Sequence, residues 1–359
     1  MAHHSSKGLT FVNAFRGSGI GDFGWKLKSE FEKKVSVKYL EIIPTWRGLI
    51  TLWKNLIRCN SQVVFNLGFT SFGNSVYRNF INFLLLKAFS IVHPRQSLIL
   101  HDSIDTSNLE NSGYSNSWLL PIGGSIAIKM LNDYNVFVFS RNFKGILKKK
   151  YKLKRVFYFP FPTENGTSLE CYRPSLNPLL LNVGYIAPYK GLEILPEIKA
   201  RLNGIDTMIV GSFYKNLLST KSGQLYKTKL ENVMRNSGVT LSGHLDDGNL
   251  IEVVKKHRTI AILPYVSGYN ASYSAIMFVT LGIPVVASNL SIFQESQENG
   301  AGIIIVDRTP EAFANAVTTI LNSPDLTRDL IEGDKKYCAH YSIHNFCDFL
   351  IDESKMVTS

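Results

Sequence analysis

The first residues with chemical potential form a glycine-rich turn after the first apolar segment. They are Arg16, Gly19, Ile20, Gly21 and Gly24. Glycine lets backbone approach a ligand closely, and a helix that starts there offers unpaired N–H groups to a phosphate. The glycines also match the dinucleotide fingerprint G-x-G-x-x-G, with Glu41 about 20 residues further on. The pattern predicts ligand contact, and it leaves a nicotinamide or flavin enzyme open beside a tight turn that binds nothing.

A lysine in the second half of the chain is a candidate for holding a phosphate. Lys190 follows the apolar segment 179–183, Gly184 and Tyr185, and it stands at the start of a predicted helix over 191–202. A lysine at the mouth of a helix can hold a phosphate as a point charge, assisted by the free N–H groups of the helix. A surface lysine without a ligand is the alternative.

A second anion-binding element is predicted where an uncharged loop leads into an uncharged helix over 272–281. A helix that is apolar all round is buried. Asn270, Ser272 and Ser274 lie near its start, where hydroxyls and unpaired amides could meet an anion. Helix capping by Asn270 or Ser272 is the other interpretation, and both can hold together.

His101 ends the predicted strand 97–101 and precedes Asp102 in a loop that is expected to face the ligand. A histidine at this place can position a substrate or handle a proton, although a lone histidine is often structural. The other internal histidines have no metal-ligand spacing and no D-x-D motif occurs. The sequence therefore predicts a protein that requires no metal or other cofactor.

Strand-like apolar segments alternate with helical patterns along the whole chain, as in parallel sheets covered by helices. The strands predicted before a Pro- and Gly-containing linker near 160–174 are 9–14, 35–43, 62–67, 97–101, 135–140 and 156–159, and the helices are 22–34, 46–58, 75–91, 125–133 and 142–151. After the linker, the strands are 179–183, 207–210, 239–241, 259–263, 283–287 and 302–306, and the helices are 191–202, 224–236, 247–256, 272–281, 310–321 and 325–339.

These elements predict an α/β fold of two Rossmann-like, doubly wound parallel-sheet domains. The expected domains are residues 1–173 and 174–340, and a final helix within 341–359 is expected to return to the first domain. Ligands of such sheets bind beyond the carboxyl ends of the strands, so the site is expected in a cleft where the two domains face each other.

The composition indicates a globular chain with an unusual distribution of charge. Of 359 residues, 45% are apolar and 19% are charged, and the net charge is +11. Residues 1–175 carry +13 and residues 176–359 carry −2. The four cysteines are widely spaced, no apolar run is long enough to span a membrane, and the first residues lack the apolar core of a signal peptide. We therefore expect a cytoplasmic protein.

The basic first half is expected to meet something anionic, such as a phospholipid surface or a lipid phosphate. The predicted helix 46–58 carries Trp46 and Trp53 beside basic residues, and a basic run follows over 141–155. This pattern is typical of a helix that lies on a membrane, although a core-facing helix and a solvated basic helix face are the alternatives. Nucleic acid is not expected, because no nucleic-acid-binding motif is recognised.

Several segments resemble GT-B glycosyltransferases, in particular glycosyltransferase family 4. They are "VGYIAPYKGLEIL", "MIVGSF", "VTLSGHLDDGNLIEVVKKHRTIAILPY" and "LGIPVVASNLSIFQESQENGAGIIIVDRTPEAFANAV". The positions that match the family pattern are Gly184, Lys190, Gly191, Gly211, Gly243, Gly282 and Pro284. The resemblance implies two domains of the GT-B type, a nucleotide-diphosphate sugar bound by the second domain, transfer with retention and His101 near the donor sugar and acceptor.

Three positions depart from the family pattern. Tyr185 stands where the family has an arginine, and Tyr269 and Met277 replace two glutamates that usually contact the donor. Glu295 matches a family acid to which the sequence assigns no role. A catalytically silent sugar-nucleotide-binding protein therefore remains an alternative to an active enzyme.

The sequence as a whole predicts a glycosyltransferase that acts on a lipid-linked acceptor or a growing glycan. His101 and Lys190 are the predicted catalytic residues. The predicted donor site comprises Gly19, Ile20, Gly21, Gly184, Tyr185, Lys190, Gly211, Tyr269, Asn270, Ser272 and Ser274. Asp102 and Arg16 are predicted on the acceptor side, and an NAD(P)-dependent oxidoreductase is the rival class of enzyme.

Overall fold

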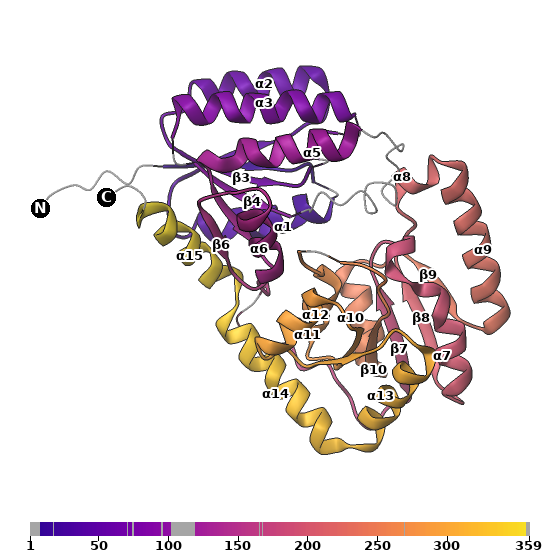
Figure 1. Cartoon of the computed structure of the whole chain (residues 1–359). Coiled ribbons are helices and arrows are strands. Elements are labelled where there is room, and N and C mark those ends of the chain that lie inside the picture. Colours follow the sequence, from indigo (N-terminus) through magenta and orange to yellow (C-terminus); the bar gives the residue numbers. More distant parts are fainter. Residues whose placement is uncertain are drawn as a thin grey trace, which may run out of the picture.

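Two six-stranded parallel sheets, each with helices on both faces, form two domains that pack against each other (Figure 1). The computed structural model describes residues 8–356 apart from 17, 70, 74, 95, 102–118, 165, 167 and 269. The predicted α/β fold with two parallel-sheet domains is confirmed.

The first sheet has the strand order β2-β1-β3-β4-β5-β6. Its strands are β1 (Leu9–Asn13), β2 (Val37–Glu41), β3 (Gln62–Leu67), β4 (Ser97–Leu100), β5 (Asn135–Val138) and β6 (Val156–Tyr158). All its pairings are parallel, so the carboxyl ends of the strands lie along one edge. The inner strands β1, β4 and β5 are buried along their whole length, which explains why apolar residues predominate in them.

Helices cover the two faces of the first sheet unequally. One face carries α2 (Trp46–Ile57), α3 (Val76–Val92), α5 (Leu119–Met130) and α6 (Arg141–Lys149), whose inward side chains share one apolar core. The other face carries α1 (Gly19–Phe31) and the last helix, α15 (Ile343–Met356). Lys34, which follows α1, donates a hydrogen bond from Nζ to Asp348 Oδ1 of α15 at 2.8 Å. The final helix thus covers the first domain.

Helix α2 has one side buried in the domain and apolar residues on its exposed side as well. Trp53 is buried, and its Nε1 donates to Asn82 Oδ1 at 2.7 Å, whereas the side chain of Trp46 is 51% exposed. The interpretation that both tryptophans reach a membrane is therefore wrong for Trp53, because its indole N–H has its partner inside the domain.

The second sheet has the order β12-β11-β10-β7-β8-β9 and is also parallel throughout. Its strands are β7 (Pro178–Val183), β8 (Asp206–Val210), β9 (Thr240–Gly243), β10 (Arg258–Leu263), β11 (Val285–Ser288) and β12 (Ile303–Val306). One face carries α7 (Leu195–Arg201), α9 (Lys221–Ser237) and α13 (Pro310–Asn322), and the other carries α10 (Asp247–Lys255), α11 (Tyr273–Leu281), α12 (Ser291–Glu298) and α14 (Pro324–His340). A short helix, α8 (Lys215–Leu218), precedes α9.

The apolar core beneath α11 continues without a break into the core beneath α1 and α15. Phe161, in the segment between the sheets, stacks on Phe23 of α1 at 5.0 Å between ring centroids and meets Tyr273 of α11 edge-on at 6.4 Å. The two domains are therefore joined by a dry aromatic contact as well as by the chain itself.

Several elements differ from the sequence-based expectation, among them the helices α1, α7 and α12. Helix α1 begins at Gly19 rather than at residue 22, because Ser18 Oγ accepts a hydrogen bond from Gly21 N at 3.0 Å and caps the helix there. The predicted helix 191–202 is divided into 3₁₀ turns and α7, since Gly191 adopts a left-handed backbone. Helix α12 had no sequence signal, because Leu290 at its N-cap provides no capping side chain.

Within the part of the chain that the structure describes, every helix is too short or too polar to cross a membrane.

Candidate functional site

Lys190 lies in the turn after β7, at the carboxyl edge of the second sheet. Its side chain is only 4% exposed. Nζ donates to Ser274 Oγ at 3.1 Å and to Tyr265 Oη, and it lies 4.2 Å from the centroid of the Tyr265 ring. Among the described residues, no carboxylate pairs with this ammonium. The protein therefore buries a lysine among hydroxyl groups and aromatic rings.

The surroundings of Lys190 keep it charged. Burial disfavours the ammonium, whereas Tyr265 and Tyr189 favour it, and the pKa of Lys190 is raised above its ordinary value. A buried cation without a counterion is costly in free energy. An anion bound beside Nζ would relieve that cost, so this position is a candidate contact for a phosphate.

Gly184 provides the space beside Lys190. A Cβ on Gly184 would lie 2.9 Å from Ser274 Oγ and 3.3 Å from Lys190 Nζ, and the backbone φ of +119° itself favours glycine. Ser274 also donates to Val183 O at 2.8 Å, and Ser272 caps α11. Predicted donor-site residues from β7, the following turn and the start of α11 thus lie together, with helix N–H groups nearby.

His101 follows β4, and buried side-chain amides fix its ring. Asn66 Nδ2 donates to Asn13 Oδ1 at 2.8 Å and to Ile20 O at 2.9 Å, so Asn66 Oδ1 is the acceptor of that amide. His101 Nε2 lies 2.6 Å from this oxygen and must therefore carry the hydrogen. Asn13 Nδ2 donates in turn to Gly21 O at 2.8 Å. The arrangement leaves His101 Nδ1 as the nitrogen with a free lone pair.

The environment of His101 keeps the imidazole neutral. Burial lowers the pKa of His101 to about 3, and the rings of Phe23 and Phe139 both lie 5.3 Å from it. A group with such a pKa is a weak base at neutral pH. His101 can therefore accept a hydrogen bond at Nδ1 and orient a hydroxyl, but it cannot readily take a proton.

The glycine-rich turn has a packing explanation. A Cβ on Gly21 would collide with the preceding turn, and one on Gly24 would collide with the asparagine pair behind His101. Gly19, in contrast, faces open space. Glu41 Oε1 accepts a hydrogen bond from Arg16 N at 2.8 Å. Two of the three glycines and the acidic residue therefore have partners inside the domain, which accounts for the fingerprint without a dinucleotide.

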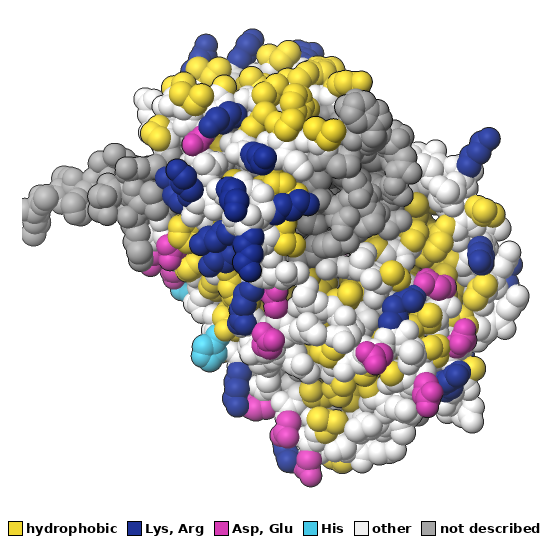
Figure 2. All heavy atoms as spheres, viewed as in Figure 1, with side chains coloured by type: hydrophobic (Ala, Val, Ile, Leu, Met, Phe, Trp, Pro, Cys, Tyr) yellow, Lys and Arg dark blue, Asp and Glu magenta, His cyan; other side chains and the backbone are white. Residues whose placement is uncertain are grey.

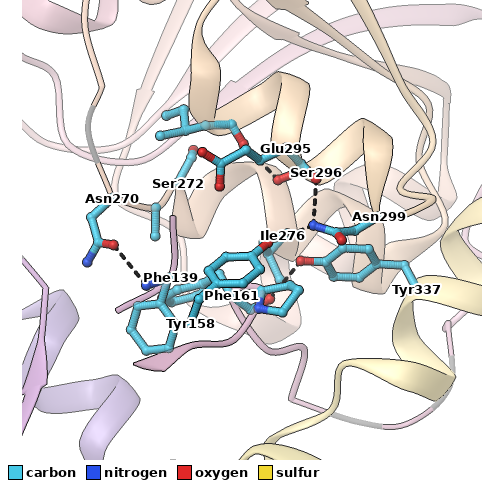
Figure 3. A pocket seen from close by; sticks show the side chains of 13 residues that line it. Phe139, Tyr158, Phe161, Asn270, Ser272, Ile276, Glu295, Ser296, Asn299 and Tyr337 are labelled. Carbon is cyan, nitrogen blue, oxygen red and sulfur yellow. Dashed lines mark hydrogen bonds between the residues drawn. The ribbon is translucent and has the colours of Figure 1, made fainter. Parts of the chain in front are cut away.

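Asn270 joins the two domains next to these residues. Its Oδ1 accepts from Phe139 N at 2.9 Å, as drawn in Figure 3, and its Nδ2 donates to Leu100 O at 2.6 Å and His101 O at 3.1 Å. The side chain is 4% exposed. Asn270 therefore connects the strand end that carries His101 to the helix start that carries Ser274. Its predicted contact with a donor stays a prediction.

Glu295 makes the second polar link between the domains. Its carboxylate accepts from Ser140 Oγ at 2.9 Å, Arg141 N at 2.6 Å and Asn142 N at 2.9 Å, all at the start of α6. A carboxylate at a helix N-terminus satisfies unpaired N–H groups and complements the helix dipole. Sequence analysis left Glu295 without a role, and the structure assigns it to the domain interface.

The cavity in Figure 3 lies within this interface. It is lined by Phe139, Tyr158, Pro160, Phe161, Asn270, Ala271, Ser272, Ile276, Ile292, Glu295, Ser296, Asn299 and Tyr337, and its volume is about 10 Å³. That volume holds about one water molecule. The cavity is therefore a packing gap and too small for a sugar.

The remaining predicted residues have other contacts or cannot be placed. Tyr185 is 45% exposed with its ring 5.7 Å from that of Tyr214. The turn after β8 packs against the backbone of Gly184, and a Cβ on Gly211 would collide with it. The guanidinium of Arg16 lies 4.1 Å from the ring of Trp25. Asp102 and Tyr269 lie outside the described residues.

Sequence analysis missed Asn13, Asn66 and Tyr265. The two asparagines are fully buried in β1 and β3, and an amide inside an otherwise apolar strand requires a partner. That signal was available in the sequence. Tyr265 precedes the uncharged loop that leads into the helix 272–281, and no sequence pattern marks it as a site residue.

No group of three or more His, Cys, Asp and Glu side chains in the described residues is arranged to hold a metal ion. The prediction that the reaction requires no metal stays a prediction.

Comparison with known proteins shows one family match and several similar folds. Residues 173–337 match the family described as glycosyl transferases group 1. A UDP- and glucose-bound structure of Alr3699/HepE from Anabaena has a TM-score of 0.68 at 13% identity, with coverage of 98% of this chain and 100% of that one. Sucrose-phosphate synthase from Thermosynechococcus elongatus has a TM-score of 0.70 at 13% identity, with 98% of each chain covered.

The lipopolysaccharide outer core galactosyltransferase WaaB is also similar, with a TM-score of 0.64 at 11% identity and coverage of 98% and 99% of the two chains. No curated sequence gives a significant match. Two facing parallel-sheet domains with these structural neighbours define a GT-B fold. Within that fold, the match to the glycosyl transferases group 1 family covers most of the second domain.

Proposed function

We propose that this protein transfers a sugar from a nucleotide-diphosphate sugar to an acceptor hydroxyl. The observation that carries the proposal is the buried Lys190 ammonium beside Gly184 and the start of α11, with no carboxylate partner in the described residues. Departure of a nucleoside diphosphate develops negative charge on phosphate. Preorganised donors at that position stabilise the transition state most when they are shielded from water.

In this proposal, Lys190 Nζ exchanges its contact with Tyr265 Oη for a phosphate oxygen. The first N–H groups of α11 and the Ser272 and Ser274 hydroxyls add further donors to the same phosphate. The open face of Gly19 and Ile20 at the start of α1 lies in the other domain and is a further donor contact. The proposed donor site also includes Tyr185 and Tyr269, which the sequence predicts there.

His101 would act as a positioning residue at the boundary of donor sugar and acceptor, with Asp102 and Arg16 on the acceptor side. Its Nδ1 lone pair can accept a hydrogen bond from a sugar hydroxyl, and its low pKa argues against proton abstraction from the acceptor. Weak basicity at this place supports transfer with retention, in which the departing phosphate rather than a protein base accepts the proton. The anomeric configuration of the product, read by NMR, tests this point.

The donor and acceptor classes follow from similar proteins. Alr3699/HepE has been solved with UDP and with UDP-glucose, so UDP sugars come first among candidate donors. WaaB is named as a galactosyltransferase of lipopolysaccharide, which favours a lipid-linked or growing glycan acceptor. A cytoplasmic protein that visits the inner membrane face would meet both substrates.

Thermal denaturation with UDP, GDP, ADP and dTDP in the presence of EDTA tests donor binding and metal independence together. At 100 times the dissociation constant, a ligand stabilises the folded state by about 2.7 kcal/mol. Absence of a shift with all four nucleotides would contradict the proposed donor site, and a shift only after Mg²⁺ is added would contradict metal independence.

A silent sugar-nucleotide-binding protein is the second candidate. Met277, in place of a family glutamate, packs partly buried against the shared core and offers no carboxylate. Turnover of a panel of nucleotide sugars separates the two functions. Binding without hydrolysis or transfer of any donor would favour the silent protein.

A further inference from the structure

The four helices on one side of the first sheet have an extreme charge composition. Helices α2, α3, α5 and α6 contain nine basic residues and no acidic residue. The basic residues are Arg47, Lys54, Arg78, Lys87, Lys129, Arg141, Lys144, Lys148 and Lys149. Among the described residues, only Lys87 and Arg141 of these nine form ion pairs, with Asp133 and Glu298. Most of this positive charge therefore has no partner within the described protein.

The same helices expose an unusual number of large apolar side chains. Of the 21 such residues exposed among the described residues, eleven lie on α2, α3 and α5, and α6 adds Ile146. The eleven are Trp46, Ile50, Ile57, Tyr77, Ile81, Leu84, Leu85, Ile91, Val92, Ile122 and Ile126. We call the exposed side chains of these four helices the outer helical face. Figure 2 shows hydrophobic side chains gathered over this part of the molecule, with lysines and arginines around them.

These apolar side chains are additional to the core of the domain. Helix α3 already buries Phe83, Leu86 and Phe89 against the sheet, and Leu84 and Leu85 point outward at 43% and 38% exposure. A helix that is apolar on both sides is expected to be covered on both sides. A contiguous exposed apolar patch marks a surface for binding.

We propose that the outer helical face docks on an anionic lipid bilayer. Aliphatic side chains that enter the region between head groups and acyl chains, flanked by basic residues that meet anionic head groups, are the combination that holds a protein on a membrane surface. A second copy of the chain is disfavoured, because it would bring two acid-free basic faces together. Nucleic acid is disfavoured, because nine of the eleven exposed apolar side chains are aliphatic and offer it no ring for stacking.

Docking on this face would bring the site close to a lipid-linked acceptor. This step of the inference rests on the proposed function. In parallel sheets of this kind, the helices begin at the edge where the strands end. Trp46 and Tyr77, at the starts of α2 and α3, therefore lie on the rim of the outer helical face that adjoins the edge carrying His101. A head group held by the bilayer could enter the site across that rim while its lipid tails remain in the membrane.

Co-sedimentation with vesicles tests the docking surface on the full chain without nucleotide. We expect binding to phosphatidylcholine vesicles that contain about one third phosphatidylglycerol at 0.1 M salt, and release at 1 M salt, where the Debye length falls from about 10 Å to about 3 Å. Lys148→Gln and Lys149→Gln at the end of α6, together with Lys150→Gln at its exposed C-cap, should lower the partition coefficient about 100-fold, or roughly fivefold for each charge.

A second variant tests the apolar part of the surface. Ile50→Gln, Ile81→Gln and Leu84→Gln together should reduce partitioning at least about tenfold, because each removes apolar area that the bilayer would cover. Matched controls lie on the second domain. Lys221→Gln, Lys229→Gln and Lys255→Gln remove the same charge, and Leu225→Gln removes a side chain that is 71% exposed. The controls should retain wild-type partitioning.

Equal binding to neutral and anionic vesicles, no binding at low salt, or equal losses in the control variants would overturn the proposal. Self-association that disappears in the Ile50, Ile81 and Leu84 variant would assign the face to a second copy instead. The thermal shift with UDP is measured without vesicles on every variant. A variant that loses vesicle binding and keeps the UDP shift separates docking from the proposed catalytic function.

Discussion

Replacing Lys190 by methionine separates the stability of the empty protein from its affinity for nucleotide. Methionine retains an unbranched apolar side chain but removes the charge and the hydrogen bonds to Ser274 and Tyr265. Hydrogen bonds to a charged group contribute about 1.5–3 kcal/mol each. Removing a buried ammonium avoids a desolvation cost of several kcal/mol. The two effects oppose each other, so we expect the unfolding free energy without ligand to change by only about 1 kcal/mol.

The effect on the nucleotide-bound protein should be much larger. We take the loss of one preorganised charged contact to a phosphate as about 2.7 kcal/mol, which weakens binding roughly 100-fold. UDP at 100 times the wild-type dissociation constant stabilises the wild type by about 2.7 kcal/mol. For Lys190→Met, the same concentration equals the dissociation constant, and the stabilisation falls to about 0.4 kcal/mol.

Thermal denaturation at that fixed UDP concentration is the assay, and Lys229→Met, at an exposed position on α9, is the matched control. The control should keep the full UDP shift. If Lys190→Met also kept it, the buried ammonium would not meet the diphosphate, and the reasoning from its missing counterion would be refuted.

Three further predictions follow from the described contacts. Gly24→Ala should destabilise the protein by about 1–3 kcal/mol, because its Cβ would strike the asparagine pair, whereas Gly19→Ala should be neutral in chemical denaturation; equal effects would contradict the packing explanation of the glycines. His101→Ala should lower turnover about 100-fold and leave UDP affinity nearly unchanged, and equal losses in the two measurements would move His101 to the donor site. Asp334 is fully buried, accepts from Gly302 N at 2.7 Å, and has a pKa that burial raises well above its ordinary value. The folded state therefore keeps a proton that the unfolded state loses above about pH 4, so wild-type stability should fall as pH rises from there. Asp334→Asn should remove this dependence, and a melting temperature below that of the wild type at pH 8 would contradict the argument.

The alternation of strand and helix could be read from the sequence because both faces of these parallel sheets are buried. Strands β7 and β8 carry runs of buried apolar residues, and Gly184 and Gly211 directly follow them. Helix α12 could not be read, because it is short and begins without a capping side chain. No sequence pattern therefore indicated that Glu295, on that helix, accepts hydrogen bonds from the start of α6.

The candidate site was predictable in its residue types but not in its partners. The sequence predicts both Lys190 and Ser274 as site residues, but only the fold shows that Lys190 Nζ lies 3.1 Å from Ser274 Oγ. The protonated nitrogen of His101 depends on Asn66, which is 35 residues earlier in the chain. Such long-range pairs are set by how the strands lie side by side, and local sequence patterns do not report them.

The position of α15 has a consequence for synthesis on the ribosome. The last strand of the first sheet ends at Tyr158, but the helix that covers one of its faces begins only at Ile343. Phe137 packs against Phe349 of that helix at 5.9 Å between ring centroids. At 5–20 residues per second, translation leaves that aromatic surface uncovered for roughly 10 to 40 s. The nascent first domain therefore exposes this apolar surface until α15 emerges, and a chain truncated before Ile343 would expose it permanently.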